Sequence, residues 1–297
     1  MYRRRTTLLA YLALAPSAIL SAGVIFYPIL RTFWAAFCQV DRKGNPQAFG
    51  TLDNFRALLG SEVFCNQVVP HTLLWTGAVV GVTIAISLFV ALALNERLPG
   101  RRLMRALVML PWATSLVISA AVWRWTLHPT QGPLNRLLED WGLMPYGQAP
   151  AWLARPGMAL AAVIAVGIWV SIPFTSVVLL AGLQSIEDSV YEAGLLDGAT
   201  GWRRLRYLTL PLLRPVLLVV VLLNVIYVVN SFPIIWTLTE GGPANQTHII
   251  VTYLYQTAIS QREYGQGYAM AVLTFIALLA FSIIYLRLQA REGLAGE

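Results

Sequence analysis

Long stretches without a charged side chain alternate with short charged segments along the 297 residues of this chain. A bilayer core about 30 Å thick is crossed by a helix of roughly 20 apolar residues. Seven uncharged windows of at least 18 residues occur, at 6–30, 63–95, 106–123, 156–186, 215–239, 241–261 and 264–286. The pattern therefore predicts an all-α integral membrane protein.

One of these windows is more polar than the others. Residues 241–261 read GGPANQTHIIVTYLYQTAISQ, whose amides and hydroxyls would be left unpaired in lipid. We assign this window to a loop with a short helix, re-entrant in one interpretation, which leaves six spans in a single membrane domain over residues 1–297. The six predicted spans lie at about 8–30, 72–94, 106–123, 157–183, 215–236 and 266–286.

Basic residues predict the orientation of these spans. Thirteen of the 21 Lys and Arg lie in 60 residues, at 1–7, 95–105, 184–214 and 287–297, against 8 in the longer opposite loops. We therefore expect these four segments, and both termini, to face the cytoplasm. Arg3–Arg5 and the apolar run after them resemble a signal peptide, but the uncharged stretch of 25 residues is too long for one, and we expect an uncleaved first helix.

Composition supports the membrane assignment, with 57% hydrophobic and only 12% charged residues. The net charge of +7 does not indicate nucleic-acid binding, because the arginines lie at the edges of apolar segments. The three histidines are too far apart to predict a metal site. Cys38 and Cys65 both lie in the first predicted external loop, where a disulfide and two ordinary thiols are both compatible with the sequence, and we favour the thiols.

No charged residue lies inside the six predicted spans. Because intramembrane ionisable groups mark proton relays and ion-coupled carriers, this pattern disfavours a secondary carrier without excluding one. Gly77 and Gly81 form a small-residue pair that would let another helix approach closely, although such pairs also arise by chance in glycine-rich apolar runs.

The predicted cytoplasmic loop at 185–211 has the pattern of a helix-turn-helix. Two alternative caps fit the start of its first helix, Ser185 with Asp188 and Ser189 with Glu192. Gly198 supplies a stop with permissive backbone angles. Thr200 would cap a second, shorter helix, which Pro211 would end. From the residues alone, a solvated surface helix and a protein-docking element fit this loop equally well.

The string E-A-G-x-x-D-G-A, followed eleven residues later by Leu-Pro, resembles the EAA loop of binding-protein-dependent ABC transporter permeases. In that family the loop is the coupling helix, which seats in the ATP-binding subunit and transmits its closure. The resemblance implies ATPase-coupling contacts at Glu192, Ala193, Gly194, Asp197, Gly198, Ala199, Leu210 and Pro211. Gly194 departs from the family, which usually has a second alanine there, and glycine weakens a helix by about 1 kcal/mol.

The resemblance extends over nearly the whole chain. Gly50–Phe55 is similar to the G-L-x-N-[FY] element of sugar-type permeases, and Leu110–Trp112 with Trp123–Trp125 is similar to their third span. Asn230–Phe232 and Leu238–Pro243 resemble the end of the fifth span in the maltose-type branch. These motifs imply the six-helix bundle of a type I ABC importer permease from the carbohydrate branch.

A polar stripe in the fifth predicted span marks a candidate substrate pathway. Asn224, Tyr227 and Ser231 lie at i, i+3 and i+7 of an otherwise aliphatic helix, and sugars are held by amides, hydroxyls and aromatic faces. The resemblance places this stretch in the translocation pathway, although Val228 is apolar where such a permease can have an amide. Hydrogen bonding between helices is an equally good interpretation. Weaker candidates in the fourth span are Trp169, Ser171, Thr175 and Ser176.

The resemblance implies a transporter subunit rather than an enzyme. Its expected partners are a second permease, two ATP-binding cassette subunits and an extracytoplasmic binding protein, in a bacterial or archaeal cytoplasmic (inner) membrane. The chain lacks the GxxxxGK[ST] phosphate loop, so ATP and Mg are expected on the partner subunits and no cofactor in this chain. The expected cargo is a sugar or polyol; the alternatives are a non-sugar solute, such as glycerol phosphate or a polyamine, and a secondary carrier.

Overall fold

The computed structural model describes residues 13–96 and 99–294, and most of this part of the chain is helical. Arg3–Arg5, used above for orientation, and the start of the first predicted span lie outside the described residues. The chain divides into two compact units. One contains the residues up to Glu62 together with Leu254–Ala277, and the other contains Val63–Tyr253 and the residues from Leu278.

The first unit begins with a helix over Ala13–Ala36, whose last part is α2 (Tyr27–Ala36). A hairpin follows, in which β1 (Cys38–Val40) pairs antiparallel with β2 (Pro46–Phe49), and then comes α3 (Asp53–Leu59). The unit also contains the helical turn Gln256–Ser260 and the first part of α14 (Tyr264–Leu294). Phe33 of α2 and Phe275 of α14 meet edge to face, with ring centroids 5.3 Å apart.

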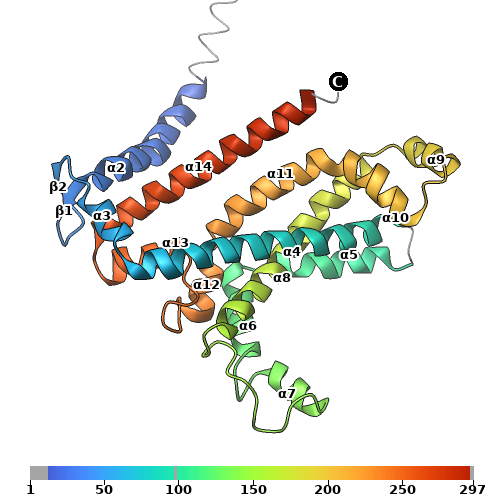
Figure 1. Ribbon diagram of the computed structural model, residues 1–297, viewed down its shortest axis with the longest axis horizontal. Coiled ribbons are helices and arrows are strands. Elements are labelled where there is room, and N and C mark those ends of the chain that lie inside the picture. Colours follow the sequence, from blue (N-terminus) through green and yellow to red (C-terminus); the bar gives the residue numbers. More distant parts are fainter. Residues whose placement is uncertain (1–12, 97–98, 295–297) are drawn as a thin grey trace, which may run out of the picture. The chain divides into compact units, whose positions relative to one another are not determined.

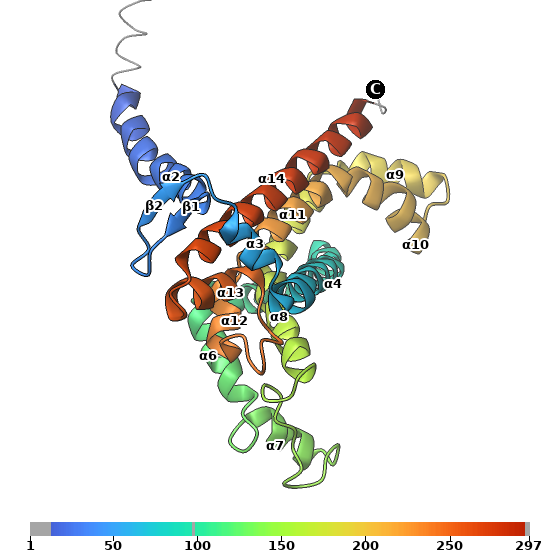
Figure 2. The same ribbon diagram turned by 60° about the vertical axis from the view of Figure 1, so that its left-hand side comes forward.

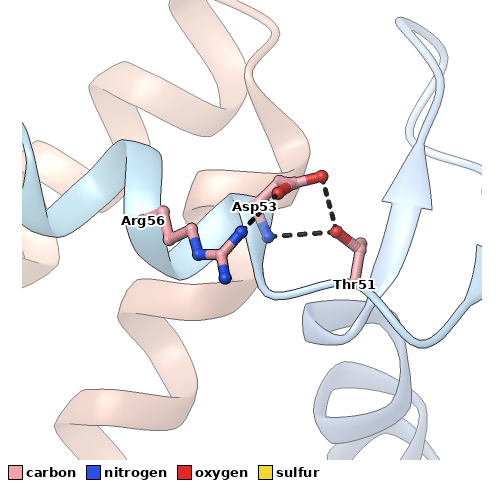
Figure 3. A network of polar contacts seen from close by, with 3 residues as sticks. All are labelled: Thr51, Asp53 and Arg56. Carbon is pink, nitrogen blue, oxygen red and sulfur yellow. Dashed lines mark hydrogen bonds and ion pairs between the residues drawn. The ribbon is translucent and has the colours of Figure 1, made fainter.

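The motif at residues 50–55 has a structural role in this unit. At the exposed start of α3, the Thr51 hydroxyl donates a hydrogen bond of 2.6 Å to Asp53, which also pairs with Arg56 at 3.6 Å (Figure 3). The Nδ2 of the next residue, Asn54, donates to two backbone carbonyls, at the end of α2 and in β1, at 2.9 Å and 2.8 Å. These bonds fix α3 against the hairpin.

Both cysteines are present as thiols. Cys38 is buried in β1, and its Sγ donates to the Trp34 carbonyl at 3.3 Å. Cys65 is exposed. The thiols that we favoured are thus the state in the structure.

The second unit is built around three long helices, α4 (Val69–Asn95), α8 (Met158–Gln184) and α11 (Leu210–Val229). Figures 1 and 2 show α4 and α8 crossing each other. The helical turn Phe64–Val68 precedes α4. The remaining helices are α5 (Arg101–Met109), α6 (Leu116–Thr126), α7 (Pro133–Asp140), α9 (Asp188–Leu196), α10 (Gly201–Arg204), α12 (Phe232–Thr239) and α13 (Ile250–Tyr255).

Trp75 holds the centre of this unit together. Its side chain is fully buried between α4 and α8, and a Cβ at Gly167 of α8 would overlap its ring. The indole Nε1 donates a hydrogen bond of 2.9 Å to the carbonyl of Val228, near the end of α11. One side chain thereby joins all three long helices, by close packing on a glycine and by a buried hydrogen bond.

A second glycine contact lies near the other end of α8. A Cβ at Gly182 would stand 2.8 Å from Leu213 Cδ1 and 2.9 Å from Val216 Cγ1, so glycine is what lets α11 approach α8 there. Gly77 and Gly81 differ, because they are exposed and no heavy atom lies within 4 Å of a Cβ built on either. The close helix approach that we predicted at this pair is therefore not made within the described chain.

Five described helices are long and apolar enough to cross a membrane, Ala13–Ala36, Phe64–Asn95, Met158–Gln184, Gly201–Val229 and Tyr264–Gln289. The span predicted at 106–123 is not a straight helix. Arg101–Ala113 and Leu116–Thr126 are two helical pieces bent by 97°. Thr114 and Ser115 between them have extended backbone angles, and the Thr114 hydroxyl bonds to both the Pro111 carbonyl (2.9 Å) and the Ser119 hydroxyl (2.6 Å).

The helix at the fifth predicted span, 215–236, begins and ends at other residues than the span that we predicted. The helix runs from Gly201 to Val229, through Pro211 and Pro215, and then stops. Asn230 and Ser231 leave the helical conformation, and α12 is a separate helix. The window at 241–261 contains only the short α13 and the turn Gln256–Ser260, as the loop interpretation expected.

We predict that Gly167→Ala destabilises the protein by about 1–3 kcal/mol, because the new methyl group overlaps a Trp75 ring that its hydrogen bond holds in place. Thermal unfolding of the purified protein in detergent measures this loss. Gly77→Ala is the matched control, since the space around it is open, and it should leave the midpoint unchanged or slightly raised. Equal midpoints for the two variants would contradict the packing role of Gly167.

Candidate functional site

The loop predicted at 185–211 is a helical hairpin joining α8 to α11. Its first arm is α9, and its second arm consists of α10 and the turn Leu205–Thr209, which continues directly into α11. The expectation that Pro211 ends the second arm is wrong. Pro211 lies in the first turn of α11, where a missing N–H costs nothing, and the helical path continues through it.

The start of α9 differs from both predicted caps. Glu187 occupies the N-cap position, and no side chain caps the helix. Ser185 instead donates to the Gly182 carbonyl at 2.8 Å, and Ser189 donates to the Glu187 carboxylate at 3.1 Å. Thr200 does occupy the N-cap position of α10, but it too makes no side-chain cap.

Gly198 ends α9 as the sequence predicted. Its φ of +76° is a left-handed conformation that glycine adopts without a steric penalty. The Ala199 N–H bonds to the Gly194 carbonyl at 2.8 Å, and the Gly198 N–H bonds to the Leu195 carbonyl at 3.1 Å. This pair of bonds is a Schellman motif, which satisfies the last carbonyls of the helix and turns the chain towards α10.

Gly194 explains how the two arms of the hairpin pack. It is buried, and a Cβ at this position would overlap Cδ1 of Leu208 on the second arm. The departure from the family's alanine therefore makes room for a leucine across the hairpin. Gly194 faces the interior of the hairpin and not its outer surface, in contrast to the surface role that we assigned to it.

The other predicted coupling residues lie mostly on the outside. Glu192, Ala193, Asp197, Gly198 and Pro211 are exposed, whereas Ala199 and Leu210 are partly buried. Motif-based reasoning missed four large apolar side chains on the same hairpin. These are Leu195, Leu196, Trp202 and Tyr207, of which Leu196 is 91% exposed. The sequence does contain a signal for them, because each is a large apolar residue at a position where a helix that faces only water would have a polar residue.

A second candidate site is a cleft of about 330 Å³ in the bundle. Three helical segments line it, namely α8, α11 and the turn Leu110–Ala113 between α5 and α6. The lining residues are Trp112, Val170, Ser171, Phe174, Leu223, Asn224 and Tyr227. The bend that breaks the third predicted span thus places Trp112 on the cleft wall. Sequence reasoning named Trp112 only as part of a family-like element and missed Phe174, because neither belongs to a polar pattern.

The three residues of the predicted polar stripe lie in different environments. Tyr227 is 44% exposed on the cleft wall. Asn224 is only 4% exposed and exchanges two hydrogen bonds with Thr175 of α8, at 3.2 Å and 3.3 Å. Ser231 is buried at the start of α12 and does not line the cleft. Asn224 thus holds α11 to α8, while Tyr227 is available to a ligand.

The weaker candidates on α8 also lie in different environments. Ser171 lines the cleft, but its hydroxyl bonds to the Gly167 carbonyl at 2.8 Å. Trp169 packs edge to face on Trp123 with ring centroids 5.5 Å apart. Ser176, which follows Thr175 on α8, is fully buried and does not line the cleft.

The segment Leu238–Pro243 contains the last two residues of α12 and the start of the turn that follows it. A Cβ at Gly241 would overlap the buried His248 ring, so glycine is required there for packing as well as for its φ of +86°. The Thr247 hydroxyl bonds to the Gly242 carbonyl at 2.8 Å. Arg124 of α6 donates to the Thr237 carbonyl at 3.2 Å. This segment therefore packs against His248 and Thr247, and it does not line the cleft.

Comparisons with known proteins agree with this architecture. Residues 64–291 match the family described as binding-protein-dependent transport system inner membrane component. A probable ABC transporter permease protein of Brucella suis is 43% identical over 284 residues, which cover 96% of this chain and 97% of that protein. A trehalose/maltose transport system permease protein of Thermococcus litoralis is 35% identical over 283 residues, covering 95% and 94%.

A solved structure is similar over nearly the full length. It is a bacterial ABC transporter involved in the import of the acidic polysaccharide alginate, and the match covers 97% of this chain and 96% of that chain, with a TM-score of 0.85 and 25% identity. With a family model matching most of its length and two full-length permease relatives, this chain belongs to the binding-protein-dependent transport system inner membrane components.

Proposed function

We propose that this chain is the membrane-spanning permease subunit of an ATP-driven, binding-protein-dependent importer for a sugar or polyol. The observation that carries the proposal is the connection between the two candidate sites. The exposed hairpin α9–α10 joins the ends of α8 and α11, and these same two helices line the cleft. A movement imposed on the hairpin therefore acts directly on the cleft walls.

The hairpin surface suits docking to an ATP-binding subunit. Four exposed apolar side chains, Leu195, Leu196, Trp202 and Tyr207, stand beside the exposed carboxylates of Glu192 and Asp197. Large apolar side chains rimmed by polar groups are typical of protein interfaces. In the complete transporter, two ATP-binding subunits would dock here and on a second permease, and each nucleotide-driven closure would displace the hairpin. Docking of ATP-binding subunits at this surface requires the hairpin and both termini to face the cytoplasm.

The cleft suits a carbohydrate. Trp112, Phe174 and Tyr227 present aromatic surfaces, on which the C–H faces of a sugar ring can pack, and the Tyr227 hydroxyl offers a hydrogen bond. The relative that is named for trehalose and maltose and the structural neighbour that imports alginate both handle carbohydrates. The neighbour has also been solved with its substrate-loaded periplasmic protein, which supports the same kind of partner for this chain.

Reconstitution tests the proposal. The tagged chain is purified with the permease, ATPase and binding protein that accompany it, and the complex is placed in proteoliposomes. We expect uptake of a labelled oligosaccharide that requires both ATP and the binding protein. Uptake driven by an ion gradient without the ATPase would instead identify a secondary carrier, and competition by glycerol phosphate or a polyamine would identify a non-sugar importer.

We predict that Gly198→Val uncouples the transporter. Valine at φ +76° is strained by roughly 1–2 kcal/mol, which opens the Schellman motif and displaces the exposed surface of α9. The measurement is the stimulation of ATPase activity by loaded binding protein, together with uptake. Gly198→Asn is the control, because asparagine tolerates the left-handed conformation and should retain most of both activities. Full stimulation in the valine variant would argue against this hairpin as the coupling element.

We predict that Tyr227→Ala weakens transport by raising the KM for uptake roughly tenfold, the loss expected for one hydrogen bond and one aromatic contact. The stimulation of the ATPase by binding protein should stay near its original level, since the hairpin is untouched. Ile226→Ala on the neighbouring helix face is the matched control, because Ile226 does not line the cleft. A similar KM for both variants would exclude the cleft as the substrate pathway.

A further inference from the structure

Arg204 stands where three elements of the second unit meet. It belongs to α10, in the second arm of the hairpin. Its Nη2 lies 3.3 Å from Oε1 of Glu96, which directly follows the last residue of α4. Its guanidinium lies over the ring of Tyr191 on α9, 5.6 Å from the ring centroid. One side chain of the second arm thereby contacts the first arm of the hairpin and the residue that follows a long helix outside it.

The surroundings of this contact are polar. Glu96, Tyr191 and Arg204 line a cleft of about 320 Å³ together with Asp188 of α9, which adds a second acidic side chain to the lining. The pair is partly open to solvent, with side-chain exposures of 42% for Arg204 and 62% for Glu96. An ion pair of this exposure adds little to stability. Its position between α4, α9 and α10 therefore indicates a role in aligning these helices with one another.

Arginine suits this position better than lysine would. The flat guanidinium can stack on the Tyr191 ring while an N–H at its edge reaches the Glu96 carboxylate. A lysine ammonium would carry the same charge without the planar face. The contact therefore orients α9 and α10 relative to each other and, at the same time, relative to the end of α4.

The other end of α4 contacts the cleft region. From Glu96, the helix runs back about 30 Å to Trp75, whose Nε1 bonds to the Val228 carbonyl at 2.9 Å. Val228 directly follows Tyr227, which lines the cleft. Between the two ends, Ser87 bonds to the Ile172 carbonyl of α8 at 3.2 Å. A single helix thus connects the hairpin with the backbone beside the candidate substrate site.

We propose that Arg204 is a positioning residue for transport, which passes a displacement of the hairpin to α4 through Glu96 and so to the Trp75–Val228 contact beside the cleft. This is a third connection, in addition to the covalent continuity of the hairpin with α8 and α11. The inference rests on the proposed function, because it assigns a mechanical role to a hairpin that is driven by an ATPase. It adds two residues outside the EAA-like motif to the coupling element.

A charge swap in the reconstituted transporter tests this role. The variants are Arg204→Glu, Glu96→Arg and the two combined, and the measurement is the number of solute molecules imported per ATP hydrolysed. We expect each single variant to lower this ratio about two- to fivefold, the range for breaking one partly exposed ion pair in a coupled element. The combined variant restores an ion pair with the two charges exchanged, and its ratio should return to within about twofold of the original ratio.

Two further variants make the result specific. Arg203→Glu changes the net charge of the same helix equally, at an exposed neighbouring position, and should keep the original ratio. Arg204→Gln removes the charge with the smallest change in shape and should show the same direction of loss as Arg204→Glu. Thermal unfolding in detergent checks that each variant keeps the original midpoint within a few degrees, as expected for a weak surface pair.

The outcomes distinguish the role of Arg204 from the proposed function of the chain. Unchanged ratios in the single variants, an equal loss in Arg203→Glu, or a combined variant no better than the worse single variant would each overturn the role of Arg204 alone. An unaltered complex without ATP-dependent uptake would overturn the proposed function, and this inference with it.

Discussion

The fit of Trp75 onto Gly167 is the contact on which the rest of the helical bundle depends. Apolar surface in a bilayer gains little by turning inward, because lipid tails are as apolar as leucine. Helices in such a bundle are instead held by close packing and by a few buried hydrogen bonds. Trp75 supplies both, since its ring fills the space of a missing side chain on α8 and its Nε1 binds the Val228 carbonyl. Trp75 thereby fixes the end of α11 beside the cleft, while Gly182 and the Asn224–Thr175 bonds hold α11 to α8 further along.

The long helices and the hairpin were predictable because their signals are local. Uncharged length indicates most of the long apolar helices. The helices α4 and α14 contain the spans that were expected at 72–94 and 266–286, and α8 contains all but the first residue of 157–183. The end of α9 at Gly198 was predictable for a similar reason, since a glycine after an amphipathic segment commonly adopts the left-handed conformation that stops a helix. The relation to transport permeases was predictable from the spacing of the loop motif, and the family comparison confirms it.

The errors arose where one residue type has two structural uses. Proline ends a helix in some contexts and begins one in others, and Pro211 stands in the first turn of α11, while Pro215 is accommodated inside that helix. The 97° bend in the third predicted span involves hydroxyl bonds of Thr114 that hydropathy does not register. The roles of Trp112 and Arg204 were missed because their importance comes from neighbours far away in the sequence, on α11 and at the end of α4.

The interior of the hairpin has one further consequence. Position 194 and position 208 share a single small volume, which in this chain is filled by the leucine side chain alone. A permease with alanine at the first position must place a smaller or differently turned side chain at the second, or open the angle between the two arms. These two sites should accordingly vary as a pair among homologous sequences, and a hybrid that takes one arm from each of two relatives would inherit a mismatch between them.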